Sequence, residues 1–381
     1  MRSSATAPDQ LPAGAYAAAL AGFPHMNVHR LSALLRAHRP ADAWLVVRGE
    51  ARATGLIERV LADSGVAAAW RAYANPERPR EAWERCRDLG VGVTVIGDHD
   101  YPALLSADRQ PPSVLFYRGS LDLLAGRRVA IIGTRNATAG GREAARSIAL
   151  GVSYAGVHVV SGLARGIDGC AHRAVVGGAG PGKAIAVVAS GPDVVYPREH
   201  RDLWEDIAAN GLLVTEAPPG TAPEAHRFPL RNRIIAALAE VVVVVESRSK
   251  GGSLITVNEA MERGVQLMVV PGGAHNRAAA GTNNLLREGA AVAVEAQDVL
   301  DVLSIDHHRH GPVIGEQRAR PRSSDREVYC LCAQQPRTID SLVTGSGRTL
   351  VDVAMALARL EQAGWVAQAD GWFQAVGSPL R

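Results

Sequence analysis

The chain has 381 residues, of which 47% are hydrophobic and 21% are charged, so we expect about two or three domains with packed cores. A net charge of +3 is too small to indicate a nucleic-acid partner by itself, and no apolar run is long enough to cross a membrane. The amino terminus lacks the apolar segment of a signal peptide, which predicts a cytoplasmic protein. The four cysteines lack the spacing of a zinc site, so we expect reduced thiols and no metal.

Residues 14–75 are predicted to form a small helical domain. Residues 15–38 (AYAAALAGFPHMNVHRLSALLRAH) have apolar residues at helical spacing, interrupted by a turn over residues 22–27. Two short helices joined by such a turn are typical of a helix-hairpin-helix or SAM-like module, which often contacts DNA backbones. They are equally typical of a small packing or interaction domain, and the sequence leaves both alternatives open.

Residues 90–303 are predicted to form a Rossmann-like, doubly wound α/β domain with a mostly parallel sheet. Short β-branched runs alternate here with helical patterns. The runs are continuously apolar, as expected for parallel strands that helices cover on both faces. The predicted strands are RRVAIIG (127–133), VHVVSG (157–162), AIAVVAS (184–190), LLVTEA (212–217), VVVVVES (241–247), QLMVVPG (266–272) and AVAVE (291–295).

Residues 304–323 are polar and aperiodic, which predicts a linker. Residues 324–376 predict three helices followed by two short strands, the order found in a winged helix. The only basic residues of the third helix and its start are Arg348 and Arg359. A helix that reads duplex DNA usually presents more basic or amide side chains, so we expect this unit to contact protein instead.

Ligands of an open parallel sheet bind at the carboxyl ends of its strands, so the loops there carry the functional signal. The first predicted strand is followed by Gly133, Thr134 and Arg135, with Gly140 and Gly141 at the start of the next helix. Glycines and free amides at a helix start favour an anion. The spacing is not GxGxxG and no P-loop motif is present, so we expect neither NAD nor ATP, and no other cofactor.

Further strand-end loops combine small residues with a basic one. One such loop is a weak signal, but several on one sheet edge suit a polyphosphate track, which favours a groove for single-stranded nucleic acid. The alternative is that these arginines pair with local carboxylates. The candidate residues are Ser161, Gly162 and Arg165 after the second strand, Arg198 after the third, Lys250, Gly252 and Ser253 after VVVVVES, and Asn283 after QLMVV.

Asp168 and His172 stand at helical spacing just beyond the second of these loops. This pair is compatible with catalysis or with metal binding. We favour structural roles, in which Asp168 accepts hydrogen bonds from backbone amides and His172 satisfies a carbonyl. No catalytic residue is therefore expected.

An arginine-rich stretch, HRFPLRNRIIAALAE, begins at His226. Its Phe228 offers a flat apolar face, and stacking of a base on such a ring contributes about 1–3 kcal/mol. We expect a loop up to Arg231 and a helix capped by Asn232. Arg231 and Arg233 point in different directions at such a helix entrance, and we expect Arg233 to bind phosphate.

Several motifs from about residue 100 to residue 295 resemble, in order, those of the DNA processing protein A family (DprA, also called Smf). The resemblance implies a dimeric protein that binds single-stranded DNA and loads the RecA recombinase in natural transformation. It implies that Arg135, Arg198, Phe228, Arg231, Asn232, Arg233, Lys250 and Ser253 line the single-strand pocket. KGGS here replaces the family's KSGS, and GTNNLL replaces GCNxLI. The motifs are DYPALLSADRQPPSVLFYRG, VAIIGTRNAT, VVSGLARGIDGCAH, SGPDVVYPREHRDL, TEAPPGTAPEAHRFPLRNRIIAALA, VVVVVESRSKGGSLIT and VVPGGAHNRAAAGTNNLLREGA.

The same superfamily contains enzymes, the lysine-decarboxylase-like phosphoribohydrolases, whose hallmark is a compact PGGxGTxxE. Here PGG and GT are separated, and no paired glutamates follow. The carboxylates that such an enzyme needs for proton transfer are missing, so we expect a protein without catalytic activity. A nucleotide N-glycosidase is the alternative.

Overall fold

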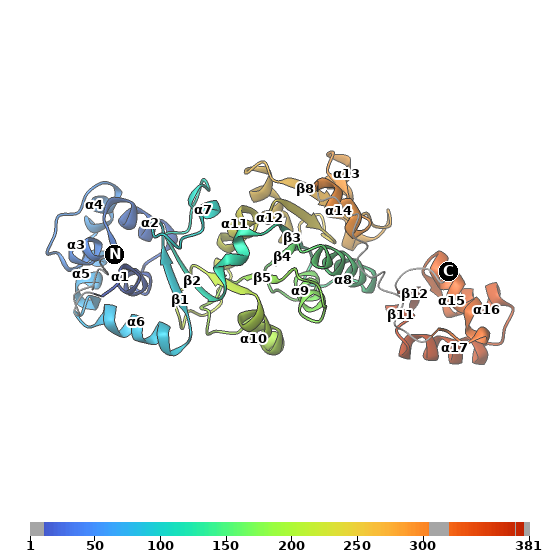
Figure 1. Ribbon diagram of the computed structural model, residues 1–381. Helices are drawn as coiled ribbons and strands as arrows, with labels where there is room; N and C mark the ends of the chain where they lie inside the picture. Colours follow the sequence, from blue (N-terminus) through green and yellow to red (C-terminus); the bar gives the residue numbers. More distant parts are fainter. Residues whose placement is uncertain (1–10, 305–319, 370, 377–381) are drawn as a thin grey trace, which may run out of the picture.

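The computed structural model describes residues 11–304, 320–369 and 371–376. An N-terminal group of helices, a central sheet with its helices and a C-terminal unit follow one another (Figure 1). Most of the predicted linker, residues 305–319, lies outside the described residues, as does most of the segment used for the signal-peptide prediction. No helix in the described part of the chain is long and apolar enough to cross a membrane.

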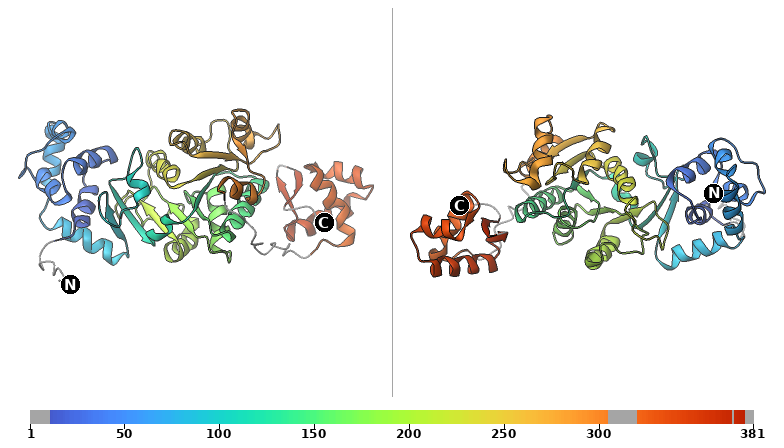
Figure 2. Two further views of the ribbon diagram at one scale, coloured as in Figure 1. Left: turned by 45° about the horizontal axis from the view of Figure 1, so that its top comes forward. Right: turned by 180° about the vertical axis from the view of Figure 1, so that it is seen from behind.

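The N-terminal helices form their own core and pack against the first strands of the sheet (Figure 2). The predicted turn over residues 22–27 is confirmed: the Asn27 side chain accepts a hydrogen bond from the Arg30 amide and caps the second helix. The indole of Trp70 donates to the Pro24 carbonyl (2.9 Å) and fixes the turn. The helices are α1 (Ala13–Ala21), α2 (Val28–Ala37), α3 (Pro40–Arg48), α4 (Leu56–Leu61), α5 (Ser64–Tyr73) and α6 (Arg78–Asp88).

The central sheet has nine strands in the order β1-β2-β6-β5-β4-β3-β7-β8-β9. All seven predicted strands are present and parallel to one another, which confirms the mostly parallel α/β fold. Two antiparallel strands at one edge, β1 and β2, were not predicted, because their short sequences lack a long β-branched run. The strands are β1 (Gly92–Val95), β2 (Val114–Gly119), β3 (Arg128–Ile132), β4 (His158–Ser161), β5 (Ala184–Val187), β6 (Leu212–Thr215), β7 (Val241–Val244), β8 (Gln266–Val269) and β9 (Ala291–Val292).

Helices cover both faces of the sheet, as the continuously apolar strands require. The parallel strands β3 and β7 are neighbours, and the order of the strands reverses between them: β4, β5 and β6 follow on one side of β3, whereas β7, β8 and β9 follow on the other. Loops that leave such neighbours diverge to opposite faces and open a crevice at the carboxyl ends of the strands. One face carries α8 (Ala139–Tyr154), α9 (Ile167–Val176), α10 (Arg201–Asn210) and α14 (Ala296–Val302), and the other carries α7 (Ala103–Ser106), α11 (Arg227–Leu238), α12 (Ser253–Met261) and α13 (Ala280–Arg287).

The C-terminal unit has its own core, which includes Tyr329 and Trp365. The three predicted helices and both strands are present, and an additional short strand, β10, pairs with β12. The winged-helix assignment itself remains a prediction. The elements are α15 (Arg326–Gln334), β10 (Arg337–Thr338), α16 (Ile339–Ser346), α17 (Leu350–Gln362), β11 (Val366–Ala369) and β12 (Trp372–Ala375).

His172, on α9, is completely buried, and this burial lowers its pKa from 6.5 to about 3. Below pH 6.5 the unfolded chain therefore binds a proton that the folded chain does not. We expect the free energy of unfolding to fall by up to about 1.4 kcal/mol per pH unit on acidification from pH 6.5 towards 5. Urea titrations of the wild type and of His172→Asn at several pH values measure this slope. Equal slopes for the two proteins would contradict the prediction.

Candidate nucleic-acid interface

A pocket of about 620 Å³ opens at the carboxyl ends of β3 and β7, where the order of the strands reverses. One wall is the loop after β3, including Gly133, Thr134 and Arg135. The opposite wall is the start of α12 with Gly252 and Ser253. The start of α11 lies between them. The pocket thus lies at the edge of the sheet that the sequence predicted, and the topology makes the loops after β3 and β7 face each other.

An aromatic pair forms one side of the pocket. The rings of Phe228 and Tyr196 lie 5.4 Å apart at an angle of 55°. The exposed Arg135 guanidinium lies 5.0 Å from the centroid of the Phe228 ring, within the range of a cation–π contact. A flat ring with an exposed cation beside it can hold a base and a neighbouring phosphate at the same time.

Arg231 supplies a fixed positive charge at the base of this pocket. Its buried guanidinium donates to the carbonyl oxygens of Gly162 (2.8 Å) and Val187. A Cβ at Gly162 would lie 2.4 Å from this guanidinium, so a larger residue there would displace Arg231. Burial lowers the pKa of Arg231 to about 10, partly offset by Asp168, so the side chain stays charged at neutral pH.

Arg233 lies on the other side of the same helix and does not line the pocket. Its guanidinium contacts the Glu216 carboxylate (2.5 Å) and the Gln110 carbonyl (2.7 Å). This position argues against the expected phosphate contact of Arg233. Two positions along a helix differ by about 200° in direction, so only one of Arg231 and Arg233 can face the pocket.

The helix itself begins earlier than predicted. It starts at Arg227, so the expected loop up to Arg231 is wrong, and Asn232 is an interior residue rather than the cap. Pro229 is compatible with this start. Proline lacks an amide proton, but the amides of the first helical turn have no intrahelical hydrogen-bond partner in any case. Asn232 lines the pocket, and its side-chain oxygen accepts from the Arg231 Nε (3.3 Å).

The anion site expected at the start of α8 is occupied by a side chain of the protein. The Glu246 carboxylate, which is 5% exposed, accepts from the Thr138 amide (2.9 Å) and the Thr138 hydroxyl (2.5 Å). A Cβ at Gly141 would lie 2.4 Å from this carboxylate, so the glycine admits Glu246 and not a ligand. A nucleotide phosphate at this helix start would meet a negative charge.

The second expected anion site, at the start of α12, opens into the pocket. Arg248, Gly252 and Ser253 line it, and nothing lies within 4 Å of a Cβ built on Gly252. The exposed Lys250 stands next to these residues but does not line the pocket. Arg248 was not among the predicted site residues, although its place two residues before Lys250 was a usable signal.

Gly162 lies outside the pocket lining, as do four other candidate residues. Arg165 forms a surface ion pair with Glu199, and Arg198 is exposed just beyond Tyr196. The remaining two act inside the fold. The buried Ser161 hydroxyl donates to the Ile131 carbonyl (2.6 Å). The Asn283 side-chain oxygen accepts from the Gly272 backbone amide (3.2 Å), and its Nδ2 donates to the Gly272 carbonyl (3.1 Å).

Asp168 and His172 have the surroundings of structural residues. The Asp168 carboxylate accepts from the Gly162 amide (3.1 Å) and so fixes the loop that contacts Arg231, rather than capping its own helix. Burial raises the pKa of Asp168. His172 is uncharged because of its low pKa, and it does not line the pocket.

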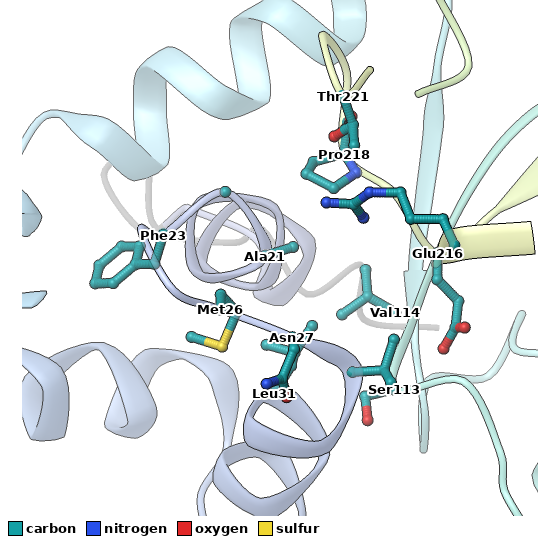
Figure 3. A pocket seen from close by; sticks show the side chains of 13 residues that line it. Ala21, Phe23, Met26, Asn27, Leu31, Ser113, Val114, Glu216, Pro218 and Thr221 are labelled. Atoms are coloured by element: carbon teal, nitrogen blue, oxygen red, sulfur yellow. Dashed lines mark hydrogen bonds between the residues drawn. The ribbon is translucent and has the colours of Figure 1, made fainter. Parts of the chain in front are cut away.

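A second, smaller pocket of about 170 Å³ lies between the turn after α1 and the edge of the sheet (Figure 3). Phe23 and Met26 line it from the turn between α1 and α2, and Glu216 and Pro218 line it from the loop after β6. Arg227 lines this pocket as well, but the half-buried Glu216 carboxylate would repel a phosphate. The larger pocket is therefore the better candidate for a nucleic-acid interface.

The part of the chain that forms the central sheet matches a known protein family. The model of a family described as DNA recombination-mediator protein A matches residues 92–304. DNA processing protein DprA of Bacillus subtilis is 39% identical over 218 residues, which cover 57% of this chain and 73% of that protein. The putative DNA processing protein DprA of Mycobacterium tuberculosis (strain H37Rv) is 39% identical over 270 residues, or 68% of each chain.

Two solved structures are similar as well. The X-ray structure of DNA processing protein A from Streptococcus pneumoniae has a TM-score of 0.62 and 29% identity, and the match covers 77% of this chain and 97% of that one. A structure of the Helicobacter pylori protein, which concerns its single-stranded DNA binding mode, has a TM-score of 0.51 and 28% identity. That match covers 57% of this chain and 97% of the other.

Proposed function

The chain belongs to the DNA recombination-mediator protein A family, and from this premise we propose that it binds single-stranded DNA and loads the RecA recombinase onto it, without catalysis. The single observation that carries the proposal is the open pocket in which Arg135 lies over Phe228, with the charged Arg231 beneath. The Helicobacter pylori relative is described as a single-stranded DNA binder, which supports it. We further propose that the protein acts in the cytoplasm, on DNA taken up in natural transformation or undergoing recombination.

Each group in the pocket has a role in this proposal. Phe228 stacks a base, and Arg135 and Arg248 contact the phosphates on either side. Arg231 adds positive potential from below, and the amides at the start of α12 favour a further phosphate near Ser253. Gly133, Thr134, Asn232 and Gly252 shape the walls, and Arg165, Arg198 and Lys250 lie outside the lining, where they attract the backbone.

Arg135→Ala tests the proposal through its salt dependence. Each phosphate contact with a single strand contributes about 0.7 to the slope of log affinity against log salt, so the variant should bind more weakly with a slope reduced by about 0.7. Fluorescence anisotropy with labelled single-stranded and duplex oligonucleotides across salt concentrations measures both quantities. Arg146→Ala is the control, because that arginine is held by Glu143 on the surface of α8. Unchanged affinity and slope for Arg135→Ala would rule out a phosphate contact there.

The alternative, a nucleotide N-glycosidase, predicts release of free base from nucleoside monophosphates. The position of Glu246 at the start of α8 argues against nucleotide phosphate binding at that helix. Incubating the purified protein with the four monophosphates and separating the products by chromatography distinguishes the two functions. Free base in amounts that scale with protein would overturn the non-catalytic proposal.

RecA loading and dimer formation are parts of this proposal that need their own measurements. Assembly of RecA on single-stranded DNA should be faster with the protein than without it, and sedimentation should show a dimer. For the C-terminal unit we propose a protein contact, because Arg359 is bound to the Asp325 carboxylate (2.6 and 2.8 Å) and Arg348 to the Ser324 carbonyl. Loss of duplex affinity on removal of residues 320–381 from the full chain would contradict that assignment.

A further inference from the structure

Helix α17 runs along one edge of the C-terminal unit (Figure 1) and has two contrasting faces. Its inner face is buried in the core of the unit and carries Val353, Ala356, Leu357 and Leu360. Its outer face, which we call the α17 stripe, carries Val351, Met355, Ala358 and Gln362, at positions i, i+4, i+7 and i+11. All four are exposed, Val351 to 71% and Met355 to 55%. The outer face of a surface helix is normally charged, so an uncharged and mostly apolar one indicates a binding surface.

The α17 stripe does not suit DNA. It contains no basic residue, and the guanidinium of Arg359 beside it is held by the Asp325 carboxylate (2.6 and 2.8 Å). Contacts with phosphate need cations or free amides, and contacts with base edges need hydrogen-bonding side chains. Only Gln362 of the four can form a hydrogen bond. The stripe therefore fits a protein surface, and the apolar face of another helix packs best against it.

The stripe is complementary to itself when two copies of α17 pack antiparallel. The large side chains of Val351 and Met355 alternate with the small ones of Ala354 and Ala358. With the two-fold axis between positions 354 and 355, Val351 lies against Ala358 of the second copy, and Met355 lies against its Ala354. Each large side chain then fills the space above a small one, as close packing of two helices requires.

The charges beside the stripe favour the same arrangement. Asp352 and Arg359 lie on one flank of the stripe, seven positions apart. One Asp352 oxygen accepts from the Thr349 hydroxyl (2.7 Å), and the Arg359 Nε and Nη2 donate to Asp325. The other Asp352 oxygen and the Arg359 Nη1 have no partner among the described residues. Antiparallel packing brings Asp352 beside Arg359 of the second copy at both ends, whereas parallel packing would set each charge against its own kind.

We propose that the α17 stripe is a contact between two copies of this chain, in which the two α17 helices pack antiparallel. The inference rests on the proposed function, and it names the partner of the protein contact proposed there for the C-terminal unit. Helix α17 has 13 residues and is about 20 Å long, so one such pair covers less surface than a standard protein interface. The contact should therefore be reversible, with a dissociation constant in the micromolar range.

Disulfide trapping in the full chain tests the contact and its register. The double variant Val351→Cys/Ala358→Cys is combined with Cys330→Ser, which removes the exposed native thiol. Mild oxidation should give a covalent dimer on a non-reducing gel, because position 351 of one copy lies against position 358 of the other. The two positions of one helix are about 10 Å apart, too far for a disulfide within the chain.

The two single cysteine variants are the controls for this experiment. Like positions of an antiparallel pair in this register are also about 10 Å apart, so each single variant should give much less covalent dimer. The single variants also report any disulfide through Cys170, which is partly exposed. Absence of covalent dimer in the double variant, or equal amounts in the single variants, would overturn the proposal.

Met355→Lys places a charge at the centre of the contact. It should raise the dissociation constant of the dimer, measured by sedimentation over a dilution series, at least tenfold. Leu56→Lys is the matched control, because it replaces an exposed apolar residue in the N-terminal helices and should leave the constant unchanged. Neither side chain belongs to a buried core, so urea denaturation should show wild-type stability for both variants.

DNA binding separates this inference from the proposed function. Met355→Lys should bind single-stranded DNA like the wild type, because α17 does not line the pocket. If Phe228→Ala and Arg135→Ala leave that affinity unaffected, the proposed function fails. If the dimer persists in Met355→Lys, the copies meet elsewhere and only the α17 contact fails. If Met355→Lys slows the loading of RecA while the dimer persists, the stripe binds RecA, and the contact between copies is overturned.

Discussion

Arg233→Ala should lower the free energy of unfolding by about 3–5 kcal/mol, because it leaves a buried carboxylate without its partner. The Arg233 and Glu216 side chains are only 9% and 15% exposed, and their charged atoms are 2.5 Å apart. Burial already raises the pKa of Glu216, and Arg233 is the main group that opposes this shift. The same arginine also donates to the Gln110 carbonyl, which ties α11 to the loop before β2. Urea denaturation at neutral pH measures the loss.

Two comparisons make this result specific to the buried pair. Arg227→Ala removes a half-buried arginine of the same helix whose contact with Glu224 is 3.5 Å long, so its effect should be much smaller, about 1 kcal/mol or less. Arg233→Met/Glu216→Leu removes both charges and should recover most of the lost stability. At a temperature where Arg233→Ala is folded, its affinity for single-stranded DNA should equal that of the wild type. If Arg233→Ala is stable but binds single-stranded DNA weakly, Arg233 contacts phosphate after all.

Phe228→Ala should lower the affinity for single-stranded DNA by about 1–3 kcal/mol, or roughly 5- to 150-fold, because it removes the ring on which a base stacks. Phe228 is partly exposed and lies outside the buried cores, so the stability should change little. The salt slope should stay the same, since a ring makes no ionic contact with phosphate. Fluorescence anisotropy over a salt series measures affinity and slope together.

Conservative variants distinguish stacking from simple apolar packing at this position. Phe228→Trp keeps a π face and should retain most of the affinity, whereas Phe228→Leu keeps only apolar area and should resemble Phe228→Ala. Equal affinity for the leucine variant and the wild type would show that the ring does not stack on a base. A reduced salt slope in Phe228→Ala would point instead to a disturbed Arg135, whose guanidinium lies over the ring.

The architecture of the sheet was predictable from local sequence. Runs such as VVVVVES are apolar without interruption, and such runs fold stably only when both faces are covered. The edge of the sheet that carries the site followed from the same pattern, because ligands bind where parallel strands end. The antiparallel strands β1 and β2 were missed, since β1 lies at the edge of the sheet and neither has a long β-branched run to mark it.

The sequence by itself determined the class of fold and the loops that border the pocket, and it named Phe228 and Arg135 as candidate residues there. Only the tertiary structure decided which arginine faces the pocket and which helix start is free for an anion. The helix begins at Arg227, five residues earlier than expected, so Arg231 and Arg233 both lie within it and point about 200° apart. Glu246 reaches Thr138 across more than a hundred positions in the chain, and no local pattern encodes such a contact. Periodicity specifies which elements form, whereas side-chain direction and charge pairing depend on how those elements pack.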